Sequence, residues 1–291
     1  MDIRHLRYFL AVVDHGTVHR AAEHLYVAQP SVSHTLRRLE EELGTELFMR
    51  RGRGLVLSSA GQALVDPARE LLRLMDVARA TVESIDGLRG GRLTIASMPS
   101  QAVSPLTGMI KAFADRYPDV EVAVVASDRP EDVREALRTG AAELGVLATP
   151  RGFDQFGDLH VLPIETQRFV LVARPDVELP DGEPIDISVL SDFRLIVGQP
   201  GTGMRRVADE IIAATNCRLA VEIEHREALL PLVLGGVGVA VVAESWQSLA
   251  HAVGLTVRTL PTTEVLHVGL AWEHQRLSPA AAAFIETSRD N

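Results

Sequence analysis

The 291-residue sequence has one cysteine, Cys217, and one lysine, Lys111. A single cysteine excludes an internal disulfide and a cysteine-based zinc site, and it argues against a two-cysteine redox sensor. No uninterrupted apolar run reaches the roughly 18 residues of a membrane-spanning helix. The N-terminal apolar run is too short for a signal peptide, so we expect a cytoplasmic protein that does not enter a membrane.

Motifs that indicate catalysis or a bound cofactor are also missing. The sequence has no Gly-x-Ser-x-Gly, no His-Glu-x-x-His and no glycine-rich phosphate loop that ends in Gly-Lys-Ser/Thr. It therefore predicts a protein that is not an enzyme and has no catalytic residues, no metal site and no cofactor.

Charge is distributed unevenly along the chain, whose net charge is −10. Residues 1–58 carry 8 arginines and 7 acidic residues, a net charge of +1, and residues 59–291 carry 21 basic and 32 acidic residues, a net charge of −11. A polyanionic partner would therefore bind through a local basic cluster in the N-terminal part rather than through the overall field.

Residues 28–43 predict an amphipathic helix. Its apolar residues recur at i, i+4, i+7 and i+11, at Val32, Leu36, Leu39 and Leu43. Its opposite face is polar and carries Ser33, His34, Arg37 and Arg38. Residues 17–24 predict a shorter helix just upstream, joined by a tight connection. This pattern predicts a helix-turn-helix over about 17–43; the alternative is a helical hairpin with a solvated face.

Two further segments complete the N-terminal part. Residues 46–58 predict a hairpin whose turn contains Arg51 and Arg53, which indicates a DNA-binding wing or, alternatively, an ordinary basic turn. Residues 59–88 predict a long helix with an apolar seam at Ala60, Leu64, Ala68, Leu71, Met75, Ala78, Val82 and Ile85. A partner chain is expected to cover this seam; the alternative is that the helix lies on its own domain. Pro67 should kink or restart the helix, with Asp66 as the cap.

Strands and helices alternate beyond a glycine-rich boundary at 87–91, which predicts an α/β fold with parallel strands and crossover helices. Strands are expected at 92–96, 120–126, 144–148, 167–173, 194–197, 219–224, 237–242 and 265–271. Helices are expected at 103–117, 130–139, 202–215, 228–234 and 279–288.

A long N-terminal motif set resembles the DNA-binding domain of LysR-type transcriptional regulators. The matching residues are Leu6, Phe9, Ala11, Val12, Val13, Gly16, Ala21, Ala22, Leu25, Gln29, Pro30, Val32, Ser33, Leu39, Glu40, Leu43, Gly44, Leu47, Phe48, Arg50, Ala60 and Gly61. Three positions depart from the family pattern: Ala28 replaces the usual capping Ser or Thr, Glu143 replaces an Asp, and Ala243 replaces a Pro.

The resemblance implies a domain organisation. Residues 1–58 would form a winged helix-turn-helix domain and residues 59–90 a dimerising linker helix. Residues 91–291 would form a two-lobed α/β effector-binding domain like the type 2 periplasmic-binding-protein fold, with lobe I at about 91–163 and 265–291 and lobe II at about 164–264. The implied function is ligand-controlled transcription regulation by a homo-oligomer, a dimer through the linker helix that assembles further into a homotetramer, which binds a double-stranded DNA operator.

Candidate site residues follow from this organisation. Those expected to contact DNA are Gln29, Pro30, Ser31, Ser33, His34, Arg37, Arg50, Arg51 and Arg53. Those expected to bind the effector lie in loops after strands: Ser97, Ser100, Gln101, Ser127, Thr149, Gln199, Thr202 and Gly203. Helix N-termini beside these loops favour a small organic anion such as a carboxylate, and Arg205 is a weaker candidate for the counter-charge. Ser, Thr and Gly are also the ordinary residues of such turns.

Two other functions remain open on the sequence alone. One is an enzyme on the same two-lobed fold with a regulatory DNA-binding domain, and it would need acid–base residues in the cleft. The other is an architectural DNA-binding protein without an effector, whose cleft would be filled by apolar side chains.

Overall fold

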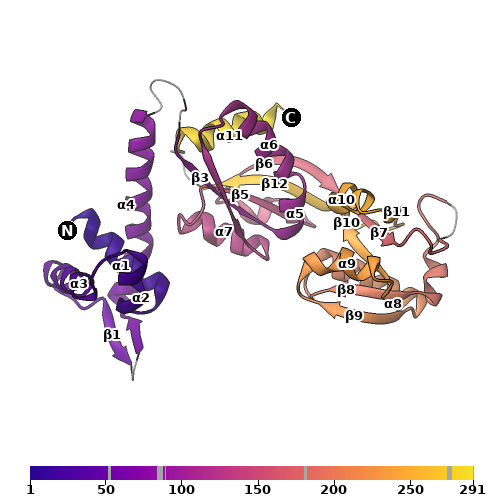
Figure 1. The fold of residues 1–291 in the computed structure, drawn as a ribbon, viewed down its shortest axis with the longest axis horizontal. Coiled ribbons are helices and arrows are strands. Elements are labelled where there is room, and N and C mark those ends of the chain that lie inside the picture. The colour runs from indigo at the N-terminus through magenta and orange to yellow at the C-terminus, as the bar shows by residue number, and fades with distance from the viewer. Residues whose placement is uncertain (52–53, 84–87, 89, 180–181, 274–276, 291) are drawn as a thin grey trace.

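Three units follow one another along the chain in the computed structural model, which describes residues 1–51, 54–83, 88, 90–179, 182–273 and 277–290. An N-terminal helical domain leads into the long helix α4 (Ser59–Glu83), and two α/β lobes follow (Figure 1). Among the helices of the described residues, none is long and apolar enough to span a lipid bilayer.

The N-terminal domain is a winged helix-turn-helix. It contains α1 (Ile3–His15), α2 (Val18–His24), α3 (Gln29–Leu43) and the antiparallel hairpin of β1 (Phe48–Arg51) and β2 (Gly54–Leu57). Phe9, Leu39 and Leu47 are fully buried in its core. The predicted helix-turn-helix and hairpin are therefore confirmed.

The carboxylate of Glu40, a half-buried residue, joins α3 to the hairpin. Glu40 Oε1 accepts hydrogen bonds from the backbone N–H groups of Leu47 at 2.8 Å and Phe48 at 3.3 Å. These two donors lie where the chain leaves α3 and enters β1, outside regular helix bonding. Glu40 thus fixes the position of the hairpin relative to α3.

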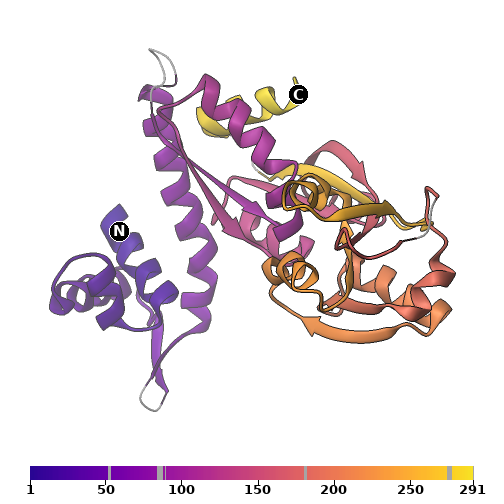
Figure 2. The same ribbon diagram turned by 45° about the vertical axis from the view of Figure 1, so that its right-hand side comes forward.

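Helix α4 runs without interruption through Pro67, so the predicted restart at this residue is wrong (Figure 2). Asp66 is not a cap, because it lies inside the helix, and its carboxylate accepts a 2.5 Å hydrogen bond from Arg138 Nη1 of lobe I. The first half of α4 packs on its own domain, where Ala68 is fully buried in the core that Leu64 also contacts. This contact holds the helix on both sides of the proline.

The predicted apolar seam of α4 is divided between two surfaces. Its N-terminal part, including Ala60, packs on the chain's own domain. Farther along, Leu71, Leu74 and Val82 remain 45%, 37% and 67% exposed. The helix is described only to Glu83, so Ile85 lies outside the described residues. The exposed part is the surface that the predicted partner chain would cover.

Each lobe contains a five-stranded mixed sheet. Lobe I has the order β4-β3-β5-β12-β6, with β3 (Arg92–Ser97), β4 (Glu121–Ala126), β5 (Leu144–Thr149), β6 (His160–Gln167) and β12 (Leu266–Trp272). Lobe II has the order β11-β7-β10-β8-β9, with β7 (Phe169–Ala173), β8 (Arg194–Gly198), β9 (Arg218–Ile223), β10 (Val239–Ala243) and β11 (Thr256–Thr259). Parallel pairs occur as predicted, but β12 and β7 run antiparallel to their neighbours.

Helices flank both sheets. They are α5 (Pro99–Val103), α6 (Leu106–Arg116), α7 (Pro130–Arg138) and α11 (Pro279–Arg289) in lobe I, and α8 (Gly203–Thr215), α9 (Leu229–Leu234) and α10 (Gln247–Ala252) in lobe II. The helix predicted at 103–117 is found as α6, which begins three residues later than predicted, at Leu106 after Pro105, and the short helix α5 before it was not predicted. Proline has no N–H to continue a helix.

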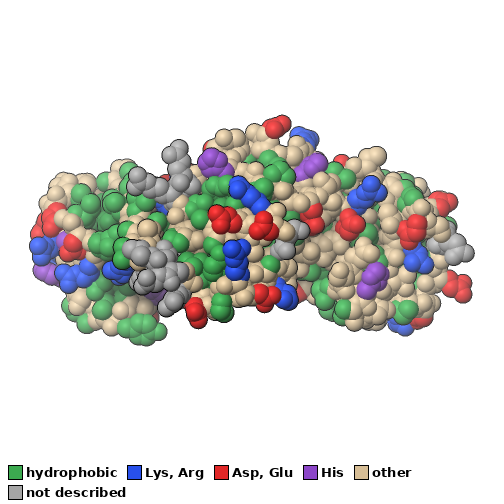
Figure 3. Space-filling model, turned by 90° about the horizontal axis from the view of Figure 1, so that it is seen from above, with side chains coloured by type: hydrophobic (Ala, Val, Ile, Leu, Met, Phe, Trp, Pro, Cys, Tyr) green, Lys and Arg blue, Asp and Glu red, His purple; other side chains and the backbone are tan. Residues whose placement is uncertain are grey.

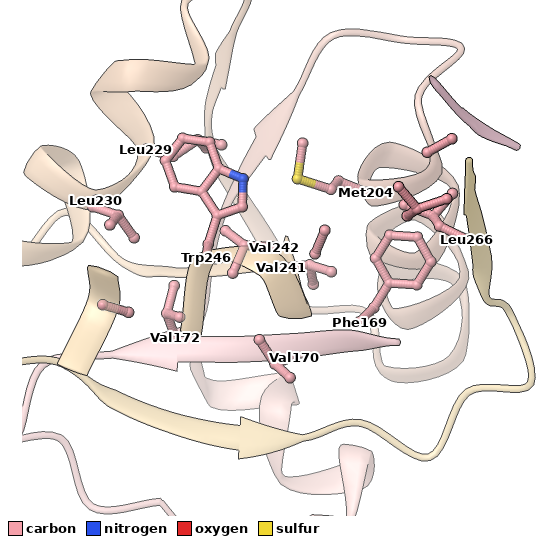
Figure 4. Close-up of a cluster of buried hydrophobic side chains, with 14 of the residues drawn as sticks. Phe169, Val170, Val172, Met204, Leu229, Leu230, Val241, Val242, Trp246 and Leu266 are labelled. Carbon is pink, nitrogen blue, oxygen red and sulfur yellow. The ribbon is translucent and has the colours of Figure 1, made fainter. Parts of the chain in front are cut away.

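The lobes are joined by the crossing from β6 to β7 at Arg168, a few residues later than predicted, and by the return into β12. Residues 164–167 therefore belong to the lobe I sheet rather than to lobe II. In lobe II, Trp246, Leu229 and the valines of β7 and β10 form a continuous apolar cluster (Figure 4). All five residues of β10 are buried, as expected for a strand covered on both faces.

Candidate DNA-binding surface and inter-lobe cavity

The outer face of α3 presents the predicted DNA-contacting residues. Val32, Leu36 and Leu39 are buried, which turns the opposite side of the helix outward. Gln29, Pro30, Ser31, His34 and Arg37 are exposed and Ser33 is half-buried. Ala28 makes no side-chain cap, as its sequence predicted.

One of the glutamates at the C-terminal end of α3 is paired inside the domain. Glu42 pairs with the N-terminal ammonium and lies 3.5 Å from Arg38 Nε. The hydrogen bond from the N-terminal ammonium is the main cause that lowers the pKa of Glu42. Arg37, in contrast, has no ion pair among the described residues. Basic and histidine side chains are visible at the end of the molecule where α3 lies (Figure 3).

The hairpin supplies the second part of this surface. Its backbone is paired from Phe48↔Leu57 to Arg51↔Gly54. Arg50 and Arg51 belong to β1, although their side chains are not described, and Arg53 lies outside the described residues. The predicted wing thus has the expected backbone position, next to the helix that would enter a DNA groove.

A cavity of about 480 Å³ lies between the two lobes. Five of the eight predicted effector residues line it: Ser100, Gln101, Gln199, Thr202 and Gly203. The volume is in the range of small-molecule sites. The two loops chosen from the sequence therefore face one another across a real cavity.

Ser97, Ser127 and Thr149 are not among the lining residues and are buried. The Ser97 hydroxyl donates to the carbonyl oxygen of Met98 at 3.1 Å, and the Thr149 hydroxyl donates to the carbonyl oxygen of Gly152 at 2.5 Å. The hydroxyls of Ser97 and Thr149 are therefore used inside lobe I, and a ligand role for these three residues stays a prediction.

Thr202 has a structural role as well as a place in the cavity wall. Its Oγ1 accepts a 3.2 Å hydrogen bond from the N–H of Arg205, which caps α8, and donates to the carbonyl oxygen of Gln199 at 3.1 Å. The hydroxyl hydrogen is therefore already used within the loop.

Substituting Thr202→Ala should lower the free energy of unfolding by about 1 kcal/mol, since it removes an N-cap. Thr202→Ser should retain nearly all of the stability because it keeps the hydroxyl. Chemical denaturation of both variants measures the difference. Equal stability of the alanine and serine variants would show that the cap contributes nothing.

One arginine of the cavity lacks the partners that the others have. Arg129 Nε lies 3.4 Å from Asp132 and Arg206 Nη2 lies 3.2 Å from Glu264. Arg226 is only 6% exposed, and its Nη2 has no hydrogen-bond partner among the described residues. Burial lowers the pKa of Arg226, and the nearby charge of Asp128, which also lines the cavity, opposes this shift.

Sequence reasoning missed Arg226 and chose Arg205 as the counter-charge. Arg205 is not free, because its Nε binds Asp209 at 2.7 Å and its Nη1 binds Glu222 at 2.5 Å. Arg226 begins a short 3-10 turn (Arg226–Ala228) before α9. Its charged neighbours, Glu224, His225 and Glu227, gave it the pattern of a solvated residue.

The cavity also has an apolar side. Met204 and Leu266 line it, and both belong to the cluster around Phe169 (Figure 4). Small-molecule sites commonly combine a largely apolar wall with a few placed polar groups.

Family models match both parts of the chain. Residues 3–62 match the bacterial regulatory helix-turn-helix protein, lysR family. Residues 86–291 match the LysR substrate binding domain.

Individual relatives cover nearly the whole chain. The HTH-type transcriptional regulator ClcR of Pseudomonas putida is 25% identical over 98% of this chain and 97% of its own. TdfR of Cupriavidus pinatubonensis, another HTH-type transcriptional regulator, is 28% identical over 99% and 98%.

Solved structures share the fold. Full-length OxyR of Pseudomonas aeruginosa superposes with a TM-score of 0.72 at 22% identity, covering 99% of this chain and 95% of its own. CbnR in complex with its target DNA superposes with a TM-score of 0.67 at 23% identity, covering 100% and 99%. The family models over both parts of the chain and these full-length matches agree with the geometry of the winged helix-turn-helix and the two lobes: the chain belongs to the LysR family of bacterial transcriptional regulators.

Proposed function

We propose that this DNA-binding regulator responds to a small organic anion, specifically a carboxylate, bound between its two lobes. The observation that carries the proposal is the buried Nη2 of Arg226, a residue of the cavity wall, which has no hydrogen-bond partner among the described residues. A buried charge without a partner is costly, and a carboxylate supplies both the opposite charge and the hydrogen-bond acceptor. The negative charge of the exposed Asp128 opposes binding of an anion. The attraction to Arg226 should outweigh this repulsion, because the anion would contact Arg226 directly.

The lining loops support the same ligand class. Ser100 lies in the first turn of α5, and Thr202 caps α8, so backbone N–H groups of both lobes are near the cavity. Ligand binding would draw the lobes together and change the arrangement of subunits on DNA. Such a change requires that the ligand bind one arrangement more tightly than the other.

The DNA contacts divide by chemistry. Gln29 can pair with an adenine edge, Ser33 with either kind of base, and Pro30 with a thymine methyl. Arg37 and the wing arginines, Arg50, Arg51 and Arg53, would contact phosphates, and Ser31 and His34 would lie at the edge of the groove. The DNA target would place the protein in the cytoplasm.

Substituting Gln29→Ala should weaken binding to a specific operator by about 1–3 kcal/mol, because it removes one bidentate base contact. Affinity for random DNA should hardly change. The matched variant Arg37→Ala should weaken both DNAs alike, since phosphate contacts carry no sequence. Fluorescence anisotropy on both duplexes measures this, and equal losses for Gln29→Ala would contradict base reading by this residue.

The proposed assembly is a dimer through helix α4, extended to a tetramer. Residues 1–58 would bind DNA, 59–90 would pair two chains, and 91–291 would bind the effector. The exposed apolar residues of the second half of α4 support this division. A symmetric dimer also suits an operator with two related half-sites.

A thermal-shift screen of the full-length protein tests the ligand class. Matched sets of small carboxylates, amines and neutral amides of the same carbon skeleton would be compared at equal concentration. Only carboxylates should raise the melting temperature, and the bound carboxylate should remain chemically unchanged. Stabilisation by amines or amides alone would contradict an anionic effector.

A further inference from the structure

Two glutamines join the cavity to the crossing between the lobes. Gln101 lies in α5 of lobe I and is 1% exposed, and Gln167 is the last residue of β6 and is 2% exposed. The Gln101 amide nitrogen Nε2 donates to Gln167 Oε1 at 3.4 Å. Gln101 also lines the inter-lobe cavity.

The network around Gln167 determines which way the Gln101 amide faces. Gln167 Nε2 donates to Glu165 Oε1 at 2.5 Å and to the carbonyl oxygen of Ser104 at 3.3 Å. A carbonyl oxygen and a carboxylate accept and cannot donate, so the amide nitrogen of Gln167 must face them. Gln167 Oε1 is then the atom directed at Gln101, and Gln101 must donate to it through Nε2.

This arrangement leaves the second polar atom of Gln101 unused. Gln101 Oε1 is buried and has no partner among the described residues. Buried polar atoms normally find a partner, and one left unpaired is destabilising. Gln101 of lobe I and Arg226 of lobe II thus both line the cavity, and each has one buried polar atom, an acceptor on Gln101 and a cationic donor on Arg226, without a partner among the described residues.

We infer that the effector is a hydroxycarboxylate, whose carboxylate accepts from Arg226 Nη2 while its hydroxyl donates to Gln101 Oε1. This inference rests on the proposed anionic effector and adds a second requirement to it. A hydroxyl suits Gln101 better than an ammonium does, because a buried ammonium would need a charged partner and the amide oxygen is neutral. Such a ligand touches both lobes at once and also reaches the residue bonded to their crossing.

The test compares carboxylates that differ by one hydroxyl. Calorimetric titration of the full-length protein would use succinate against malate, and benzoate against its three hydroxylated isomers, so that several carboxylate–hydroxyl separations are sampled. At least one hydroxylated carboxylate should bind at least about tenfold more tightly than the same carboxylate without the hydroxyl. The reason is that its hydroxyl pairs with a buried acceptor that the other ligand leaves unpaired. Titration with aspartate in place of malate tests whether an amino group can replace the hydroxyl.

Variants at Gln101 test whether this residue causes the preference for the hydroxylated carboxylate. Gln101→Met and Gln101→Leu remove the acceptor, and in whichever of them folds the ratio of affinities should fall to about one while the plain carboxylate still binds. Gln155→Leu, which changes an exposed glutamine of lobe I that is not among the lining residues of the cavity, should leave the ratio unchanged. The inference would be overturned if the wild-type protein showed no preference for the hydroxylated carboxylate, or if the variants at Gln101 kept the wild-type ratio of affinities. Tighter binding of aspartate than of malate would overturn it as well. Failure of every carboxylate to bind would instead contradict the proposed function itself.

Discussion

Replacing Leu71 and Leu74 by aspartate is expected to dissociate the protein into monomers and to abolish high-affinity operator binding. Both side chains lie on the outer side of α4, 45% and 37% exposed in the single chain. Burying each leucine contributes about 1.5–3 kcal/mol, and two-fold symmetry counts each substitution twice. The loss of four leucines, together with four uncompensated charges, should weaken association by more than about 10⁴-fold.

The choice of Leu74 follows from the packing of α4. Met75 belongs to the seam predicted from sequence, but it is half-buried, whereas Leu74 is exposed. Gln62→Asp with Ala63→Asp adds the same charge at two exposed positions of the same helix and is the control. Light scattering and anisotropy report mass and DNA affinity. An unchanged mass for the leucine double variant would place the subunit interface elsewhere.

Substituting Arg226→Gln should eliminate the response to carboxylates without harming the unliganded protein. The ligand would lose a charge-assisted hydrogen bond, and its affinity should fall by about 1.5–3 kcal/mol or more. The melting temperature of the unliganded variant should stay the same or rise, because the substitution removes a buried charge whose Nη2 has no partner among the described residues. Stability and ligand affinity are thus expected to change in opposite directions.

Arg206→Gln is the matched control for this prediction. Arg206 lines the same cavity, but it already pairs with Glu264. Its substitution should leave most of the carboxylate affinity in place. Thermal shift with and without the carboxylate measures both effects, and a full ligand response in Arg226→Gln would exclude Arg226 as the counter-charge.

Local patterns were sufficient for the DNA-binding domain. The apolar spacing of Val32, Leu36 and Leu39 together with Gly44, whose φ is +69°, predicted α3 closely. The alternation of apolar strands with amphipathic helices likewise predicted most of both lobes. These features depend on residues near one another in sequence, which is why they could be read without a structure.

Long-range burial could not be predicted in the same way. Strand β6 lies at the edge of its sheet, and its exposed Glu165 and Thr166 interrupt the apolar pattern from which a strand is predicted. The strand was therefore missed. The seam of α4 did not show which residues its own domain covers. Arg226 was missed because its burial depends on packing between distant residues. Gln101 was predicted from the sequence, but only the structure shows that its Oε1 has no partner among the described residues.

A footprint of the full-length protein on DNA tests the effector-controlled regulator most directly. The operator would be enriched from random duplexes, and the footprint would be recorded with and without a carboxylate that raises the melting temperature. If the ligand alters the arrangement of subunits on DNA, the protected length or the pattern of enhanced cleavage should change at saturating ligand. Identical footprints with and without bound ligand would contradict control of DNA binding by this cavity.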